Sequence, residues 1–536
     1  MKRRISALII LCAMFLAACQ LDDEMYSVYD VYYKLGFTTD STHAVLGSAA
    51  KMDSLDQRSD VWIKVKGGFE YAASNIVRYG HCWAKGKEMP VINANESNCK
   101  YLEGKPNANE PFYTTIADLE CETEYSVRSF IVTSDGNIGY NPEVLVVTTD
   151  IPHDKWFETN GLVKNGIIAG RSDCVSIITV IGKGETVDTL TFFGMGRAGD
   201  ACYADLWCYS SRNKTFEQIP EVKNNNGEIM RLWGAVGFGI NYVERDVPHH
   251  LVYLGCGCSR GADYNRSDYN QQFFVYDIDE RKWKQVTYYD GKNVELTRRP
   301  FQGEVRTGAV GFSVREWGFV GLGEFVNTTG NTPHYHCDFY LYVMEKDAKT
   351  GKYTPEKGYF NQMTDDFGFG ARSGASVAMI DDYAYIIGGR GEKGYYDQLI
   401  PVRFSMPINS RPDSYTFTWP KSDNVYRFRD KFVDYDFKAR GFAAGFAVGD
   451  EIFYGMGEGL DENGNTVFYS DMVKFDRNTG FLPKVCAPYM NVKSPESSVS
   501  RSTVIHGGDR AFVVGGTMQG DGDFTILNNS EWVYRP

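Results

Sequence analysis

The sequence predicts an all-β protein, and three observations lead to this prediction. Short runs of β-branched and aromatic residues, bounded by Gly, Asn and Asp, recur along the 536 residues. One pattern of strands returns six times in residues 154–536, at intervals of 60 to 75 residues. No segment after residue 18 has the ~18 uninterrupted apolar residues of a membrane-spanning helix. Self-similarity at such a period indicates a propeller or a solenoid.

Each repeat begins with an arginine and continues through four predicted strands. After Arg372, an apolar strand and a turn lead into a second strand that ends in Gly388-Gly389. A third, aromatic strand follows after a loop, and an aromatic residue such as Trp283 marks a fourth. The repeat arginines are Arg171, Arg231, Arg306, Arg372, Arg440 and Arg501. Four strands form one blade, so we expect a six-bladed β-propeller.

The two ends of the repeat region predict how the ring closes. The last repeat stops at Pro536, directly after its third strand. A matching fourth strand lies upstream at 155–158, where Trp156 precedes Arg171 by the same 15 residues by which Phe216 precedes Arg231. We therefore expect this N-terminal strand to complete the last blade, which would leave no open sheet edge.

The glycines at the end of the second strand resemble those of kelch repeats, which have a double glycine there and an aromatic residue in the fourth strand. The double glycine is literal at Gly388-Gly389 and Gly515-Gly516, and the other four repeats have Gly-x-Gly. Glycine there allows positive φ and close approach of neighbouring backbone. The resemblance implies a kelch-like propeller over residues 154–536.

The N-terminus predicts export and lipidation. Residues 1–18 read as a lipoprotein signal peptide, with three cations, a short apolar run and small residues before Cys19, the predicted lipidation site. An ordinary signal peptide with a chance cysteine is the alternative. Residues 19–30 would form a lipidated tether, and the acidic stretch 20–24 resembles the export tag of Bacteroidetes-type surface lipoproteins. We expect an outer-membrane lipid anchor, at the cell surface or on the periplasmic face.

Residues 31–150 do not follow the repeat and predict a separate β-sandwich. Short alternating strands with turn residues between them fill this segment, for example 61–65 and 125–132. The run from Leu119 to Tyr125 resembles the tyrosine corner of fibronectin type III domains, in which a tyrosine hydroxyl ties two strands together. The resemblance implies a fibronectin III/Ig-like domain, which would serve as a spacer or bind a ligand itself. The boundary is expected at 149–153.

Charge and cysteine content exclude some classes of function. The net charge is −13, and removal of the leader's cations makes it more negative, so nucleic acid is not an expected partner. Ten cysteines remain without Cys12 and Cys19, and they show no regular framework. A chain of this length needs no disulfides for stability. Most cysteines should be buried, and one or two bridges are left open.

The kelch resemblance places the arginines around a funnel at one face of the propeller. Kelch substrate adaptors hold acidic side chains with arginines at this position, and a kelch-type epimerase handles a carboxylate sugar. Arginine suits this role because its planar fork pairs with carboxylates. Loop aromatics could stack on a sugar ring. The alternative is pairing within the blades and ordinary packing. The candidate ligand-binding residues are Arg171, Arg231, Arg306, Arg372, Arg440, Arg501, Trp233, Tyr264, Tyr335 and Tyr395.

Catalytic and metal sites have weaker support in the sequence. Glu324, Glu392 and Glu458 each lie close to a blade glycine and could project into the funnel as acid or base, although solvated loop glutamates are the simpler interpretation. The run from His334 to Cys337 has two alternate histidines but no further ligands nearby. The copper-site residues of galactose oxidase, which shares the repeat type, have no match. We expect neither a metal nor a cofactor.

Three hypotheses of function follow. In the first, an outer-membrane lipoprotein binds a glycan or another carboxylate-bearing ligand at its propeller face, as an accessory to nutrient uptake through an outer-membrane transport complex. In the second, the protein is an enzyme similar to sialic acid mutarotases or epimerases. In the third, it is a protein-binding scaffold in an envelope complex. The fold alone does not decide among them.

Overall fold

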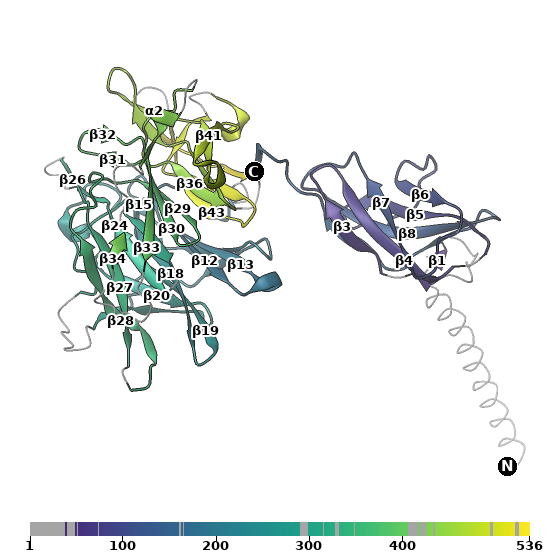
Figure 1. Ribbon diagram of the computed structural model, residues 1–536, viewed down its shortest axis with the longest axis horizontal. Coiled ribbons are helices and arrows are strands. Elements are labelled where there is room, and N and C mark those ends of the chain that lie inside the picture. Colours follow the sequence, from purple (N-terminus) through teal and green to yellow (C-terminus); the bar gives the residue numbers. More distant parts are fainter. Residues whose placement is uncertain are drawn as a thin grey trace, which may run out of the picture. The chain divides into compact units, whose positions relative to one another are not determined.

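The protein was analysed as a computed structural model that describes most of the chain. The described residues are 38–39, 49–50, 52–72, 74–159, 162–163, 166–289, 299–314, 316–326, 332–347, 349–405, 416–418, 425–431, 435–493, 497–519 and 525–536. The predicted signal peptide and tether, with Cys19, lie outside them. The chain divides into two compact units, Met1–His153 and Asp154–Pro536 (Figure 1).

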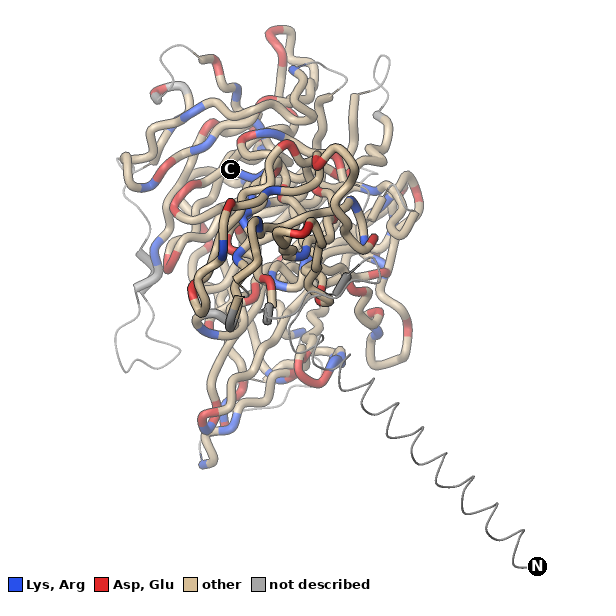
Figure 2. Tube along the Cα trace, turned by 90° about the vertical axis from the view of Figure 1, so that its right-hand side faces the viewer, with Lys and Arg blue, Asp and Glu red and all other residues tan. Residues whose placement is uncertain are grey.

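The prediction of an all-β protein is confirmed for the described residues. Their one α-helix is the single turn α2, Phe428–Lys431. No helix within the described ranges has the length and apolar character to cross a membrane. On the side that Figure 2 turns to the viewer, Lys and Arg are interspersed with Asp and Glu along the chain.

Two antiparallel sheets form the first unit. One has the order β1-β9-β8-β5-β6 with β10 beside β8, and the other has the order β2-β4-β3 with β7 beside β4. The strands are β1 (Thr38–Thr39), β2 (Ala49–Ala50), β3 (Ser54–Arg58), β4 (Ile63–Tyr71), β5 (Ile76–Lys85), β6 (Cys99–Glu103), β7 (Pro111–Ile116), β8 (Glu124–Thr133), β9 (Ile138–Tyr140) and β10 (Leu145–Thr148).

The two sheets of this unit share a core. Ile63 and Ile116 from one sheet pack in a single cluster with Val127 and Val147 from the other. The Glu120 N–H donates to the Tyr125 hydroxyl at 3.0 Å, so the tyrosine ties the chain as the sequence predicted. Alternate residues of β7 are buried and exposed, as expected for a strand with one face on a core.

Six sheets, one for each repeat, make up most of the second unit, and their strands pair antiparallel except for one short parallel pair in the third sheet. The first three have the orders β12-β13-β16-β17, β18-β19-β20-β21 and β23-β24-β27-β28, the last with β22 beside β28. Their strands are β12 (Val175–Ile181), β13 (Asp188–Gly194), β16 (Leu206–Ser210), β17 (Thr215–Ile219), β18 (Val236–Glu244), β19 (Val247–Gly255), β20 (Phe273–Asp277), β21 (Lys282–Gln285), β22 (Thr287–Tyr288), β23 (Val310–Val314), β24 (Trp317–Gly321), β27 (Phe339–Lys346) and β28 (Tyr353–Thr364).

The other three sheets repeat this arrangement. Their orders are β29-β30-β33-β34 with β35 beside β33, then β36-β37-β40-β41, and finally β43-β44-β47-β11. Their strands are β29 (Ser376–Ile380), β30 (Tyr383–Ile387), β33 (Gln398–Ser405), β34 (Thr416–Thr418), β35 (Tyr426–Arg427), β36 (Ala444–Val448), β37 (Glu451–Gly455), β40 (Met472–Asp476), β41 (Leu482–Val485), β43 (Thr503–His506), β44 (Ala511–Val514), β47 (Glu531–Arg535) and β11 (Lys155–Glu158).

The last sheet contains both ends of the unit. Strand β11 pairs antiparallel with β47, with Trp156 opposite Tyr534. The Trp156 ring is buried against Tyr489 and Tyr534, and its Nε1 donates to the Ala487 carbonyl at 3.0 Å. This is the pairing that the sequence predicted for Trp156.

Each sheet packs on the next, mainly through its first strand. Strand β12 contacts β18, β18 contacts β23, and the sequence of contacts continues through β29, β36 and β43 back to β12. Apolar clusters fill the space between neighbouring sheets, as where Val175 and Phe192 of the first sheet pack with Val252 and Phe274 of the second. These clusters are the core of the unit.

A backbone hydrogen bond joins each repeat to the next at the glycine motif. The second glycine donates its N–H to a carbonyl just before the first strand of the following repeat, at 2.7–3.0 Å. The six bonds are Gly196 to Leu232, Gly257 to Arg306, Gly323 to Arg372, Gly389 to Arg440, Gly457 to Val499 and Gly516 to Arg171. The last of them runs from the sixth repeat to the first.

The geometry of the motif explains why the second residue is always glycine. Gly323 has a φ of +100°, and a Cβ there would lie 2.8 Å from the Thr307 carbonyl oxygen. Leu322, the residue before it, also has a left-handed φ of 58° but keeps a buried side chain. The first position of the kelch-like double glycine therefore tolerates a side chain, and the second does not.

We predict that Trp156→Ala lowers the free energy of unfolding of the second unit by about 3–5 kcal/mol, because it removes a buried ring that holds the first described strand of the unit to the last. The measurement is the urea transition followed by circular dichroism. Trp283→Ala, on the outer strand β21 where the ring is half-buried, is the matched control and should cost less than half as much. Equal losses of unfolding free energy in the two variants would show that the pairing of β11 with β47 does not stabilise the unit more than an ordinary outer strand does.

Candidate functional site

An inner hairpin or bridge begins directly after each glycine motif. In each repeat the residue after the second glycine bridges to the residue three positions before the first strand. The six bridged pairs are Ser172 with Arg197, Trp233 with Cys258, Thr307 with Glu324, Ser373 with Arg390, Gly441 with Glu458 and Ser500 with Thr517. Since the repeats pack in succession, this position brings side chains from all six repeats to one end of the unit.

The next residue along each of these segments has a left-handed backbone, and together they form what we call the axial ring: Asp173, Gly234, Gly308, Gly374, Phe442 and Arg501. Backbone N–H groups of this ring donate to carbonyls of the neighbouring ring member, for example Arg501 to Phe442 at 3.0 Å and Asp173 to Arg501 at 3.2 Å. Three members are glycine, and the other three hold a side chain in a conformation that glycine adopts at less cost.

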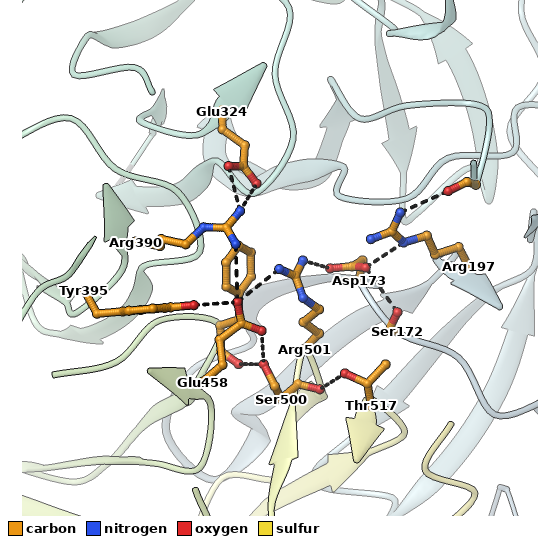
Figure 3. A network of polar contacts seen from close by, with 12 residues as sticks. Ser172, Asp173, Arg197, Glu324, Arg390, Tyr395, Glu458, Ser500, Arg501 and Thr517 are labelled. Atoms are coloured by element: carbon orange, nitrogen blue, oxygen red, sulfur yellow. Dashed lines mark hydrogen bonds and ion pairs between the residues drawn. The ribbon is translucent and has the colours of Figure 1, made fainter. Parts of the chain in front are cut away.

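Six charged side chains form an alternating chain of ion pairs over this ring, which we call the axial cluster. Figure 3 shows their arrangement. In order along the chain of contacts they are Arg197, Asp173, Arg501, Glu458, Arg390 and Glu324. The successive N···O distances are 2.9, 3.0, 3.3, 3.6 and 3.0 Å. Every one of these pairs joins residues of different hairpins or loops, so the cluster is a tertiary feature.

Glu458 is the most connected member of the axial cluster. Its carboxylate accepts hydrogen bonds from the Tyr395 hydroxyl at 3.1 Å, the Ser500 hydroxyl at 2.9 Å and Arg501 at 3.3 Å (Figure 3). Arg390 approaches it as well, while donating to Glu324. A carboxylate with this many donors is held in one orientation.

Exposure differs between the two signs of charge. The side chains of Arg197, Arg390 and Arg501 are 23%, 28% and 16% exposed, whereas the three carboxylates are 5–7% exposed. The three carboxylates are therefore buried more deeply than the three arginine side chains, each of which keeps part of its surface exposed.

An aromatic ring lies close to each of the three arginines. The guanidinium of Arg501 lies 3.6 Å from the ring centre of Phe442, and that of Arg390 lies 5.3 Å from the same ring. Arg197 lies 3.7 Å from the ring of Trp233. Such stacking favours a cation over an aromatic face and restricts its side-chain freedom.

The electrostatics of the cluster favour the ionised forms. Burial raises the pKa of Asp173, but Arg501 and Arg197 outweigh it and hold that pKa below its usual value. Burial acts to lower the pKa of Arg501, but Glu458 and Asp173 outweigh burial and hold that pKa above its usual value. Burial and the nearby Glu458 raise the pKa of Tyr395, so its hydroxyl stays a hydrogen-bond donor at neutral pH.

A cavity of about 580 Å³ lies along the first strands of the six sheets. Its lining begins with the residues just after the axial ring, such as Cys174, Ala235 and Ser502, and continues toward Val180 and Asp381. No ring residue lines it among those described. The ring therefore separates this cavity from the axial cluster, and the lining is mostly small side chains.

Four of the predicted ligand-binding arginines are inside the sheets instead of at a funnel. Arg171, Arg306, Arg372 and Arg440 are at most 5% exposed. Arg306 donates to both carboxylate oxygens of Asp338, at 2.6 and 2.9 Å, and to the Leu322 carbonyl at 2.9 Å. The alternative interpretation, pairing with blade acids and carbonyls, therefore describes these four, and we correct their assignment accordingly.

These arginines are buried because each repeat also provides a polar partner for its arginine, located at the start of the third strand. Arg171 pairs with Asp205 and Arg440 with Asp471, each acid standing just before the third strand of its own sheet. Arg372 has Gln398 there instead, and burial lowers its pKa to about 10. These arginines fasten the third strand to the glycine turn.

The other two repeat arginines are out of register with these four. Leu232 and Val499 occupy the equivalent position, as their carbonyls accept the glycine N–H bonds described above. Arg231 lies one residue earlier and is exposed. Arg501 lies two residues later, on the axial ring, and is the one repeat arginine within the axial cluster.

The remaining candidate residues divide between the cluster and its surroundings. Tyr395 contacts Glu458, and Tyr335 stands opposite Glu324 in the hairpin of β25 (Glu324–Val326) and β26 (Pro333–Tyr335). Trp233 is buried beneath Arg197, with Tyr264 packed edge-on against it. Of the catalytic candidates, Glu324 and Glu458 belong to the axial cluster. Glu392 is exposed at the turn between β31 (Arg390–Gly391) and β32 (Gly394–Tyr395).

Sequence reasoning missed Asp173, Arg197, Arg390 and Phe442. Arg197 and Arg390 stand directly after the second glycine, at the same position as Glu324 and Glu458. Aligning all six repeats on that glycine would have found them. Asp173 and Phe442 carry no such signal, because their side chains stand where three other repeats have glycine.

The histidine pair of 334–337 does not form a larger metal-ligating group. His334 is exposed, and the buried His336 places its Nε2 3.1 Å from the Val305 carbonyl. The two rings are 5.2 Å apart. Among the described residues no group of three or more His, Cys, Asp or Glu side chains is arranged to hold a metal ion.

Comparison with known proteins finds distant structural likeness to solved structures. No family model matches the chain, and no curated protein matches it. The solved structure entitled "Structure of YjhT" aligns with a TM-score of 0.40 and 10% sequence identity, covering 67% of this chain and 98% of that one. At this level of similarity, the assignment of a site rests on the geometry described above.

We predict that Arg501→Met destabilises the second unit by about 3–5 kcal/mol, because Asp173 and Glu458 would then be buried without a shared cation. Chemical unfolding of the purified chain measures this. Arg477→Met is the control, since Arg477 pairs with the exposed Asp381 and should cost less than about 1 kcal/mol. An equally small loss for both variants would contradict the buried role of Arg501.

We also predict that His336 makes stability depend on pH between 6.5 and 4. Burial and Arg306 lower the pKa of His336 to about 4. As the pH falls, His336 therefore becomes protonated near pH 6.5 in the unfolded chain but only near pH 4 in the folded protein. The free energy of unfolding therefore falls as pH drops through this window, by up to about 3 kcal/mol from this group.

Urea unfolding at pH 7.5 and pH 4.5 tests this. In His336→Gln the loss of stability between the two pH values should shrink, because glutamine can donate to Val305 without titrating. His334→Gln, at the exposed histidine, should leave the loss unchanged. An undiminished loss in His336→Gln would contradict the prediction.

Proposed function

We propose that the six sheets of residues 154–536 form a closed six-bladed kelch-like β-propeller, with β11 as the outer strand of the last blade. Three observations support this: the succession of first-strand contacts that returns to β12, the six glycine N–H bonds, and the pairing of β11 with β47. For the first unit we propose a fibronectin III/Ig-like sandwich, supported by its two-sheet core and the Tyr125 tie.

We propose that this propeller binds a glycan or another carboxylate-bearing ligand at the axial cluster. The single observation that carries the proposal is the layering of charge: three partly exposed arginines over three buried carboxylates. Guanidinium groups pair bidentately with carboxylates, and here they are already oriented by Asp173, Glu324 and Glu458. Binding of the ligand therefore costs little conformational entropy of the arginine side chains.

The rim of the cluster suits a sugar ring. Tyr335 and Tyr395 are half-buried in two neighbouring inner hairpins, opposite Glu324 and Arg390 respectively. Their rings offer apolar faces next to the charged donors. A ligand with a carboxylate on a pyranose would use both features, whereas a neutral sugar would use only the rings.

For the whole protein we propose an outer-membrane lipoprotein that captures this ligand as an accessory to a transport complex. The support is the lipobox-like leader with Cys19 and the acidic stretch after it. The separate sandwich unit lies between such an anchor and the propeller in the chain and would serve as a spacer.

An enzyme related to sialic acid mutarotases or epimerases is the second candidate. One observation favours it: the Tyr395 hydroxyl and the Glu458 carboxylate, 3.1 Å apart, place a proton donor beside an acceptor at the same spot as the arginines. Both groups would have to reach a bound sugar for acid or base catalysis. The same cluster thus serves either candidate.

The binding proposal predicts the effect of Arg390→Gln. The chain produced without residues 1–24 should bind acidic glycans on an array in preference to their neutral counterparts, and Arg390→Gln should weaken this binding about tenfold or more, because a charge-assisted bond is worth roughly 1.5–3 kcal/mol. Arg477→Gln, an arginine away from the cluster, is the control and should bind as the parent does.

Two outcomes would redirect the proposal. Equal binding of acidic and neutral glycans by parent and variant would remove the axial cluster from ligand recognition. Anomeric exchange followed by NMR in the same samples addresses the enzyme: acceleration that disappears in Tyr395→Phe while binding persists would favour catalysis over simple capture.

A further inference from the structure

Two cysteines of the first unit stand directly opposite each other in its larger sheet. Cys82 on β5 and Cys99 on β6 are Cα partners in the antiparallel register. Both are buried, at 0% and 7% exposure, in one apolar cluster with Phe130 and Tyr140. Residues paired across antiparallel strands project to the same face of the sheet, so the two sulfurs share one side.

The hydrogen bonding around this pair identifies its geometry. The Trp83 N–H donates to the Asn98 carbonyl at 3.0 Å, which is the bond between the residue after Cys82 and the residue before Cys99. A bond in that place makes the cysteines a non-hydrogen-bonded pair, in which the Cα atoms of antiparallel strands are about 4.5 Å apart. Disulfides span Cα separations of about 4.4–6.8 Å.

Each of the two thiols makes a long hydrogen bond to a backbone carbonyl. The Cys82 sulfur donates to the Arg128 carbonyl at 3.7 Å and the Cys99 sulfur to the Glu96 carbonyl at 3.4 Å. Rotation about the Cα–Cβ bonds would exchange these contacts for a sulfur–sulfur bond without moving the strands. No other two cysteines are register partners in the strands that the structure describes.

We propose that Cys82 and Cys99 form a cross-strand disulfide. The two thiols lose two protons and two electrons to a disulfide oxidant, a protein or a small molecule, which is reduced to two thiols while one bond forms between the sulfurs. Burial raises the pKa of the Cys99 thiol, which disfavours the reactive thiolate once the sheet has formed. Oxidation therefore belongs to folding and not to a later event.

The bridge would close the connection between β5 and β6. That segment, residues 86–98, has no strand of its own; among its contacts with the larger sheet, the Pro90 carbonyl accepts from Arg128, and the Ile92 N–H donates to the Tyr140 hydroxyl at 3.1 Å. Cross-linking its two ends reduces the freedom of the unfolded chain, which stabilises the folded unit.

The experiment refolds the chain, produced without its leader, in a mixture of reduced and oxidised glutathione, then blocks thiols with iodoacetamide under denaturing conditions. Peptide mapping without reduction should give a peptide linking Cys82 to Cys99. Reduction should lower the Tm of the first unit by on the order of 10 °C. The double variant Cys82→Ala, Cys99→Ala should show no change of Tm with reductant, and Cys337→Ser should behave as the parent.

The peptide map either supports or overturns the proposed disulfide. Alkylation of both cysteines after refolding in oxidised glutathione, or linkage of either one to a different cysteine, would overturn the proposal. The mapping uses the parent chain, so a variant that fails to fold does not affect it. Because the oxidant is supplied in the tube, the result is independent of where the protein resides and of what the axial cluster binds.

Discussion

The hydrogen bond from the second glycine of each repeat to the next repeat is the contact on which the rest of the second unit depends. It is made by backbone alone, at 2.7–3.0 Å in all six repeats, and it leaves no room for a side chain at the donor. Because the contact is independent of side chains, the repeats can diverge in sequence and still make the same backbone contact. It also fixes where each inner hairpin starts, since Arg197, Glu324, Arg390 and Glu458 follow the donor glycine directly.

Arginines only a few residues from this contact have two different roles: some stabilise a sheet, and others belong to the axial cluster. The arginines buried in the sheets find their acids in the same repeat, as Arg306 finds Asp338 and Arg440 finds Asp471. Two arginines of the axial cluster pair with acids of other repeats: Arg390 with Glu324, and Arg501 with both Asp173 and Glu458. The first kind stabilises a single sheet. The second kind exists only once the sheets have been brought together.

The same distinction explains what the sequence could predict. Strand periodicity and the glycine motif were enough for the all-β architecture, and the spacing of Trp156 was enough for its pairing with the last strand. Glu324 and Glu458 were found because they adjoin glycines. The roles of Arg306 and Arg372 were not predicted. A sequence motif shows that an arginine precedes a strand, but it does not show that an acid or amide inside the sheet pairs with that arginine. Arg501 entered the candidate list through a misaligned repeat, although it does lie in the cluster.

The alternating charges of the axial cluster also limit how a ligand can bind there. Each arginine already has a carboxylate partner, so an incoming anion must either share the guanidinium with that carboxylate or displace the carboxylate from it. Displacement would take one of two arginines away from a buried carboxylate such as Glu458 or Asp173, which weakens the compensation of its charge. Sharing leaves the ion pairs intact and uses donors on the solvent side. A ligand held in this way gains orientation from the cluster while the contacts between repeats, which the cluster itself provides, remain in place.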